Sequence, residues 1–206
     1  MLGLHNSNTA AYTDKRTSKI KYISHRTDML AWKMNNRISD VLEFDLNGAF
    51  VPAENYQLMN YGIGKVKKLI STFTFPKKKL IFSIYLGGFI ELHTDSDSLN
   101  KKQMALEYPN EWILRGERLM TFMVYLSNVT LGGNTVFPLL GISVPPVKGS
   151  ALFWNTITSE GLMDQRMKHL GCPVVHGDKW ITNKWIKWHH HMFKFPCYPN
   201  KRFYSL

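Results

Sequence analysis

The first part of the chain combines strand-like and helix-like patterns of apolar residues. Residues 9–23 predict short extended segments separated by polar turn residues, and residues 56–61 predict another strand. Between these ranges, apolar side chains recur at helical spacing from Thr27, which we expect to cap an amphipathic helix. Residues 45–54, with Gly and Pro as breakers, predict a loop. The apolar face of the helix is predicted to contain Leu30, Met34, Ile38 and Val41.

The second half of the chain consists of short apolar stretches separated by turn residues such as Gly132 and Gly133. The predicted strands are 118–126, 134–137, 141–145, 150–154, 172–175 and 179–186. Short strands at this spacing, after a helix, are typical of a β-sandwich or a jelly roll. We therefore predict a mainly β fold with flanking helices.

Length and composition fit one catalytic domain. The 206 residues are 44% hydrophobic and 13% aromatic, which is enough for a packed core. No apolar run reaches the roughly 18 residues of a membrane-spanning helix, so a membrane partner is not expected. The first 20 residues contain no apolar region of the kind that a secretory signal needs.

The net charge of +11 raises the question of nucleic-acid binding. Six lysines lie in one stretch, residues 65–87, that contains no acidic residue, and the rest of the chain carries only +5. The basic character is therefore mostly local, and no nucleic-acid partner is predicted.

The candidate chemistry lies in His93-Thr94-Asp95, His169 and Lys179. Two imidazoles and one carboxylate can occupy three adjacent positions on Fe(II) and leave the others for a co-substrate and O₂. His-x-Asp in a strand places both side chains on one face, although such a tripeptide alone fits a surface pair better than a ligand pair. Lys179 lies ten residues beyond His169 and could hold the far carboxylate of the co-substrate. This layout indicates a 2-oxoglutarate-dependent oxygenase.

Other histidines and the cysteines have simpler interpretations. His189-His190-His191 predict a solvated tail after a strand, with adventitious metal binding as the alternative, and His176 is expected at the surface in a turn. Cys172 and Cys197 could be buried free thiols or, in an oxidising compartment, a disulfide.

Several longer motifs resemble the catalytic domain of the collagen prolyl 4-hydroxylase α subunit. The resemblance covers residues 10–197 with its motifs in the family's order. They are GGNTVFP (132–138), KGSALFW (148–154) and RMKHLGCPVVHGDKWITNKW (166–185), with Arg16–Lys19 and Asn60–Gly64 upstream.

The resemblance implies a double-stranded β-helix (jelly-roll) core and hydroxylation of peptidyl proline at C4, in collagen-like X-Pro-Gly segments. It implies that His93, Asp95 and His169 bind Fe(II), and that Lys179 and Tyr61 hold 2-oxoglutarate. L-Ascorbate would restore oxidised iron.

The resemblance also implies a cellular setting. It pairs Cys172 with Cys197 in a disulfide, which implies the oxidising lumen of the endoplasmic reticulum with protein disulfide isomerase as partner subunit. Asn128-Val129-Thr130 is an acceptor sequon in that compartment. The family's N-terminal region has no counterpart, so we expect a C-terminal fragment or a truncated paralogue. We expect a support region at 1–55, the oxygenase domain at 56–197 and a tail at 198–206.

An insert at residues 65–87 interrupts the family register N-Y-G-x-G-G-x-Y-E-P-H-x-D. Removing it gives NYGIGGFIELHTD, in which Ile90 replaces the family tyrosine and Leu92 a proline. The insert has no Asp, Glu, Ala, Arg, Asn or Gln, so we hypothesise a short intron translated in frame, with a genuine loop as the alternative. Sequencing transcripts across codons 64–88 distinguishes the two.

The insert also affects the functional prediction. Residues 80–86 have high β-propensity and no charge, so they could mispair or aggregate and damage the enzyme. Two alternatives therefore remain beside a proline hydroxylase. One is a catalytically silent binding or assembly module, and the other is a related oxygenase with another peptide substrate.

Overall fold

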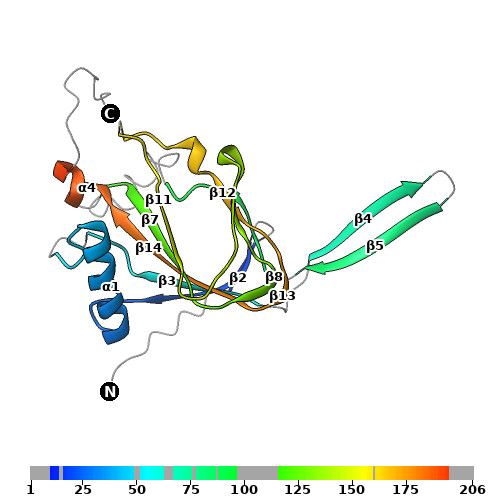
Figure 1. Cartoon of the computed structure of the whole chain (residues 1–206), viewed down its shortest axis with the longest axis horizontal. Helices are drawn as coiled ribbons and strands as arrows, with labels where there is room; N and C mark the ends of the chain where they lie inside the picture. The colour runs from blue at the N-terminus through cyan, green and yellow to red at the C-terminus, as the bar shows by residue number, and fades with distance from the viewer. Residues whose placement is uncertain are drawn as a thin grey trace.

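The computed structural model describes residues 10–13, 16–48, 52–62, 67–75, 78–86, 88–96, 116–159 and 161–194. Antiparallel strands dominate these residues, and one long helix packs against them (Figure 1). The predicted tail at 198–206 and Cys197 lie outside the described residues.

A ten-stranded sheet forms the centre of the fold. Its strands are β1 (Ala10–Thr13), β2 (Arg16–Ile23), β3 (Tyr56–Tyr61), β6 (Ile90–His93), β7 (Arg118–Tyr125), β9 (Thr135–Phe137), β10 (Ile142–Val144), β11 (Ala151–Asn155), β12 (His169–Gly171) and β14 (Lys179–Lys187). Their order is β10-β9-β12-β6-β2-β3-β14-β7-β11, with β1 paired to β2. The sheet curls on itself, as the predicted jelly roll requires (Figure 1).

Smaller elements complete the described structure. Two further pairs of strands are β8 (Val129–Gly132) with β13 (Val174–Gly177), and β4 (Lys67–Phe75) with β5 (Lys78–Leu86). The α-helices are α1 (Met29–Leu42) and α4 (Trp188–His191), and 3₁₀ turns cover Pro138–Leu140, Gln165–Met167 and Met192–Lys194.

Most predicted strands are confirmed. The exceptions are the range 172–175, which is displaced to β13, and four strands that were not predicted, namely β4 and β5 of the insert and the short strands β8 and β12. The N-terminal segment joins the main sheet, because β2 pairs with both β3 and β6. The division between residues 1–55 and 56–197 stays a prediction.

The helix is confirmed, but its predicted cap is wrong and its predicted apolar face is right only for Met34 and Ile38, which pack in the core. Asp28, not Thr27, is the N-cap, and its carboxylate accepts a hydrogen bond from the Ala31 amide. Leu30 is 76% exposed and Val41 67% exposed, while Asn35 is fully buried. Asn35 tolerates burial because its amide group donates to the Leu46 carbonyl and to the Asn47 side chain. The buried face therefore follows Ala31, Asn35 and Ile38.

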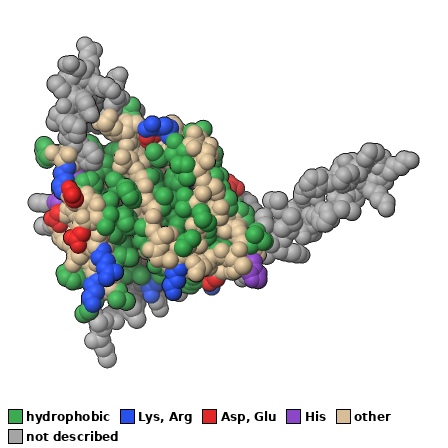
Figure 2. Space-filling view, in the orientation of Figure 1, with side chains coloured by type: hydrophobic (Ala, Val, Ile, Leu, Met, Phe, Trp, Pro, Cys, Tyr) green, Lys and Arg blue, Asp and Glu red, His purple; other side chains and the backbone are tan. Residues whose placement is uncertain are grey.

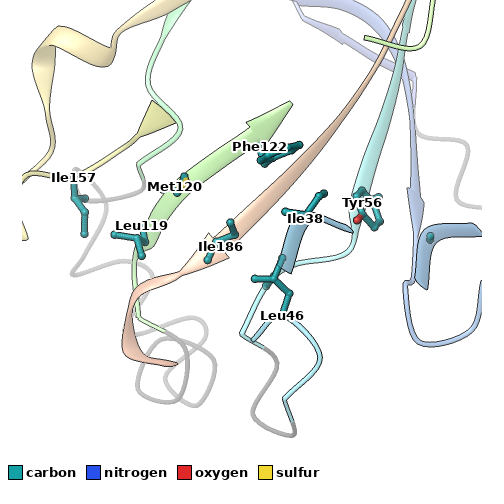
Figure 3. Packing of buried hydrophobic residues seen from close by; sticks show 10 residues of the cluster. Ile38, Leu46, Tyr56, Leu119, Met120, Phe122, Ile157 and Ile186 are labelled. Carbon is teal, nitrogen blue, oxygen red and sulfur yellow. The ribbon is translucent and has the colours of Figure 1, made fainter. Parts of the chain in front are cut away.

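Buried side chains form one cluster on each face of the central strands. One cluster lies between α1 and the sheet, where Ile38 and Leu46 pack with residues of β3, β7 and β14 (Figure 3). The second contains Met59, Met123 and Ile181 from the opposite face of the same strands. This alternation follows from the two-residue period of a strand.

The insert forms a hairpin that extends away from the rest of the molecule (Figure 1). Its strands β4 and β5 pair with each other over nine positions. β6 still pairs with β2 and β12, so the insert leaves the strand that carries His93 in register. The sequence suggested that residues 80–86 could mispair with core strands. Among the described strands, β5 pairs only with β4.

The histidine run is not the solvated tail that was predicted. It lies in the helix α4, and His191 is 1% exposed and stacks on Phe44. His176 is exposed, as expected, but it lies in β13 and not in a turn.

Charge is dispersed on the face in view. Lys and Arg side chains lie separately around the rim of the described surface, with hydrophobic and uncharged side chains between them (Figure 2). Among the described helices, none is long and apolar enough to cross a membrane.

Candidate metal and co-substrate site

A cavity of about 220 Å³ opens between strands on the concave side of the sheet. Polar and charged side chains line the larger part of its wall and apolar side chains line the rest, which suits a small ligand that carries charge. The lining residues with candidate chemical roles are Tyr61, His93, Asp95, Arg118, His169 and Lys179.

Strand pairing brings the two candidate histidines together. His93 ends β6 and His169 begins β12, and the two residues are directly paired across these antiparallel strands. Their ring centroids are 4.3 Å apart. His93, Asp95 and His169 each offer a ligand atom, and these atoms lie within 4.8 Å of one another. The structure thus gathers three residues that the sequence separates by up to 76 positions.

Each histidine has one ring nitrogen fixed by a backbone carbonyl. His93 Nδ1 lies 2.8 Å from the Glu91 carbonyl oxygen, and His169 Nδ1 lies 3.0 Å from that of Met167. Since a carbonyl only accepts, each Nδ1 carries the proton and donates it. In the neutral form of each ring, the lone pair is then on Nε2, which faces Asp95.

Asp95 completes the cluster from a position that the sequence did not predict. It lies in a bend two residues beyond the end of β6, so the expectation that His93 and Asp95 share one strand is wrong. Its Oδ1 is 3.8 Å from His93 Nε2, and its Oδ2 is 3.7 Å from His169 Nε2. Burial opposes its ionisation, but His169, His93 and the Thr121 hydroxyl outweigh burial and lower the pKa of Asp95.

Lys179 is a buried cation in the wall of the same cavity. It begins β14 and is only 2% exposed. Burial lowers the pKa of Lys179 to about 8, with the Cys172 thiol acting in the opposite direction. The rings of Tyr61 and Tyr125 lie 5.5 and 5.8 Å from its Nζ, within the range of a cation–π interaction.

The structure places Tyr61 in the cavity but describes only one of the two cysteines. Tyr61 lines the cavity and is 3% exposed, with its hydroxyl 3.4 Å from the Met59 sulfur. Cys172 is half-buried. Because Cys197 lies outside the described residues, the disulfide between them stays a prediction.

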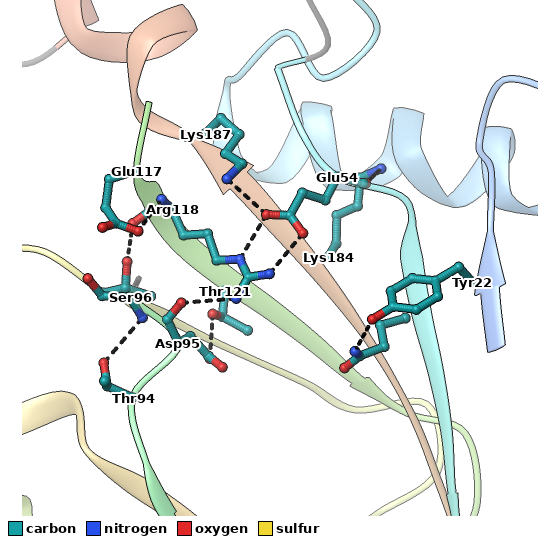
Figure 4. A network of polar contacts seen from close by, with 12 residues as sticks. Tyr22, Glu54, Thr94, Asp95, Ser96, Glu117, Arg118, Thr121, Lys184 and Lys187 are labelled. Atoms are coloured by element: carbon teal, nitrogen blue, oxygen red, sulfur yellow. Dashed lines mark hydrogen bonds and ion pairs between the residues drawn. The ribbon is translucent and has the colours of Figure 1, made fainter. Parts of the chain in front are cut away.

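A network of charged side chains borders the three candidate metal ligands (Figure 4). The Arg118 guanidinium donates to both carboxylate oxygens of Glu54, at 2.8 and 2.9 Å. Lys187 Nζ lies 3.0 Å from the same carboxylate. Burial would raise the pKa of Glu54, but Arg118 and Lys187 together lower it to about 2. Glu54 is therefore ionised and holds both cations.

The sequence model of the family described as "2OG-Fe(II) oxygenase superfamily" matches residues 80–187, more than half of the chain. The chain belongs to this superfamily. The match includes His93, Asp95, His169 and Lys179. The prediction of an Fe(II)- and 2-oxoglutarate-dependent oxygenase family, made from the same residues, is confirmed.

Curated relatives of this oxygenase include prolyl 4-hydroxylase α subunits. Subunit alpha-1 of Rattus norvegicus is 32% identical over 189 residues, which cover 92% of this chain and 29% of that protein. Subunit alpha-3 of Homo sapiens is 33% identical over 182 residues, which cover 88% of this chain and 28% of that protein. The chain thus spans less than a third of the length of these relatives.

Solved structures confirm the predicted jelly-roll fold. A viral collagen prolyl hydroxylase from Paramecium Bursaria Chlorella virus-1, in complex with 2OG, superposes with a TM-score of 0.57 at 22% identity, over 84% of this chain and 80% of that one. A Trichoplax adhaerens prolyl hydroxylase bound to a peptide fragment of the hypoxia inducible factor oxygen degradation domain gives 0.50 at 17% identity, over 85% and 66%.

The side chains of the oxygenase fit Fe(II) and 2-oxoglutarate. Two imidazoles and one carboxylate are the donors that a non-haem Fe(II) ion takes, and their ligand atoms lie within 4.8 Å of one another. A small dicarboxylate beside this cluster would find a buried ammonium, Lys179, in the same cavity. The superfamily and the cluster together support both cofactors.

Sequence reasoning missed several residues of this site. Arg118 and Thr121 contact Asp95 from β7, and Glu54 holds Arg118. None of these lies in a motif, and only the folded sheet brings them to Asp95. Thr135 also lines the cavity and accepts a hydrogen bond from the Tyr125 hydroxyl at 2.8 Å. It lies within the motif GGNTVFP, which could have identified it.

Proposed function

We propose that this chain is an Fe(II)- and 2-oxoglutarate-dependent dioxygenase that hydroxylates peptidyl proline at C4. The observation that carries the proposal is the convergence of His93, Asp95, His169 and Lys179 on one cavity. The prolyl 4-hydroxylase subunits among its relatives support proline as the residue that is hydroxylated.

The roles of the side chains follow from their chemistry. His93 and His169 would bind the metal through Nε2, because their Nδ1 atoms are committed to backbone carbonyls. Asp95 would supply the third, anionic ligand. Bound Fe(II) with 2-oxoglutarate supplies the activation of O₂ that no protein side chain can provide.

Lys179 would hold the distal carboxylate of 2-oxoglutarate, and the Tyr61 hydroxyl would assist it. An ammonium in a buried wall interacts strongly with a carboxylate because little solvent screens the pair. The apolar side chains Met59, Met123 and Ile181 in the same wall would limit the entry of water. The chain therefore contributes orientation and a shielded pocket.

Further assignments rest on the resemblance to prolyl 4-hydroxylase α subunits. These are collagen-like X-Pro-Gly peptides as substrate, ascorbate as reductant, the endoplasmic reticulum lumen as location and protein disulfide isomerase as partner subunit. The relatives are named as subunits, which supports work within a larger assembly. The support for ascorbate and for the location is the family resemblance alone.

The test is peptide-stimulated decarboxylation of 2-oxoglutarate by the purified chain with Fe(II) and ascorbate. Mass spectrometry of the peptide would locate the hydroxyl group. We expect turnover with a proline-rich peptide and none with the same peptide containing alanine for proline, or with the variant His169→Ala. Turnover only on other peptides would favour a related oxygenase. No turnover by folded protein, with or without residues 65–87, would favour a silent binding module.

A further inference from the structure

Asp95 differs from the two histidines in how its backbone is held. His93 and His169 occupy paired positions of β6 and β12, so the sheet fixes both. Asp95 lies in the bend after β6 and belongs to none of the described strand pairings. A metal ligand requires a fixed position, so contacts outside β6 must supply it.

Two residues of β7 make these contacts (Figure 4). The hydroxyl of Thr121 donates to Asp95 Oδ2 at 2.7 Å, and Thr121 is fully buried. The guanidinium of Arg118 donates from Nη1 to the main-chain carbonyl of Asp95 at 3.2 Å. One contact therefore holds the carboxylate, and the other holds the backbone that carries it.

Arg118 is itself held on several sides. Its guanidinium donates to both oxygens of Glu54 and lies 3.8 Å from the centroid of the Trp185 ring. Lys187 pairs with the same Glu54 carboxylate. A planar guanidinium with two parallel hydrogen bonds and a stacked ring has little freedom to rotate. Residues of β7 and β14 thereby fix the guanidinium that contacts Asp95.

We propose that Thr121 and Arg118 are positioning residues of the iron site. Thr121 binds Oδ2 of Asp95 and so directs Oδ1, the oxygen on the side of His93, to the metal. Arg118 fixes the backbone of the bend. The inference rests on the proposed function, because it requires that Asp95 is a metal ligand.

The experiment compares metal affinity among threonine variants of the whole chain. Thr121→Val removes the hydroxyl and keeps the shape, while Thr121→Ser keeps the hydroxyl. Mn(II), which does not oxidise in air as Fe(II) does, is titrated and the free ion is measured by electron paramagnetic resonance. We expect Thr121→Val to bind Mn(II) about 10- to 100-fold more weakly and Thr121→Ser to bind as the unaltered chain does.

Thr182→Val is the matched control. Thr182 is 3% exposed and lies on β14 between Ile181 and Asn183, which line the cavity, so it faces the other side of the sheet. The same chemical change there should leave Mn(II) affinity unchanged. Thermal unfolding of the metal-free proteins shows which variants are folded. If Thr121→Val does not fold, Thr121→Ala serves in the same comparison.

The outcomes separate this inference from the proposed function. Folded Thr121→Val or Thr121→Ala that binds Mn(II) as tightly as the unaltered chain would overturn the positioning role. A loss of affinity equal to that of Thr182→Val would overturn it as well, because the effect would be general destabilisation. If the unaltered chain binds neither Mn(II) nor Fe(II), the proposed function itself fails.

Discussion

Replacing Lys179 with Met should stabilise the protein and greatly weaken its binding of 2-oxoglutarate. Lys179 is 2% exposed, and its pKa falls from 10.5 to about 8 because burial disfavours the charged amine. Each pKa unit corresponds to about 1.4 kcal/mol, so the buried charge lowers the free energy of unfolding at pH 7 by roughly 3 kcal/mol. Met keeps an unbranched apolar stem and carries no charge.

The pH dependence follows from the sign of this shift. Between pH 8 and 10.5 the unfolded chain holds a proton on Lys179 that the folded chain has released. Stability therefore rises with pH across this range, and below pH 8 the full penalty applies. The advantage of Lys179→Met should be largest at neutral pH, decrease above pH 8 and disappear near pH 10.5.

Urea unfolding of the metal-free proteins at several pH values between 7 and 10 measures the difference in unfolding free energy between Lys179→Met and the unaltered chain. Lys148→Met, at an exposed lysine, is the control for the loss of one positive charge. Calorimetric titration of 2-oxoglutarate into metal-loaded protein checks the loss of binding. A Lys179→Met protein that is less stable than the unaltered chain at pH 7 would contradict this destabilising effect of the buried charge, and so would a difference in stability that is the same at every pH.

Three further results are expected. Glu54→Gln should destabilise the protein above pH 4.5. The difference in unfolding free energy from the unaltered chain should shrink as pH falls toward 2, because the folded-state pKa of Glu54 is about 2. Acid titrations of both proteins, followed by circular dichroism, would measure this difference. Asp28→Ala should cost about 1 kcal/mol in thermal unfolding by removing the cap of α1. Deletion of residues 65–87 should leave Mn(II) affinity unchanged, since the hairpin pairs only with itself among the described strands; a lost metal site would contradict this.

The sequence predicts the parts of the site that depend on local spacing. His93, His169 and Lys179 lie in recognisable motifs, and short apolar stretches with turn residues between them predict most strands. β8 and β12, with four and three residues, are too short to show an alternating pattern. The insert is visible as an interruption of the motif, but its hairpin requires the pairing of β4 with β5.

The features that the sequence does not predict depend on contacts in the folded structure. Asn35 lies on the buried face of α1 because groups of the following turn satisfy its amide, and a polar residue at that position misdirects a prediction from hydrophobicity. Thr27 and Asp28 are both good capping residues, and only the backbone geometry selects Asp28. Thr121 and Arg118 reach Asp95 from a strand more than 20 residues away in sequence.

The most direct test of this metal and co-substrate site is an anaerobic titration of 2-oxoglutarate into the Fe(II)-loaded chain, followed by the visible absorption of the metal complex. We expect a band that saturates at one 2-oxoglutarate per chain. It should be absent in His169→Ala and require far more 2-oxoglutarate in Lys179→Met. If the folded, Fe(II)-loaded chain gives no band, the assignment of this site is contradicted. It is also contradicted if His169→Ala and Lys179→Met give the same band as the unaltered chain at the same concentrations of 2-oxoglutarate.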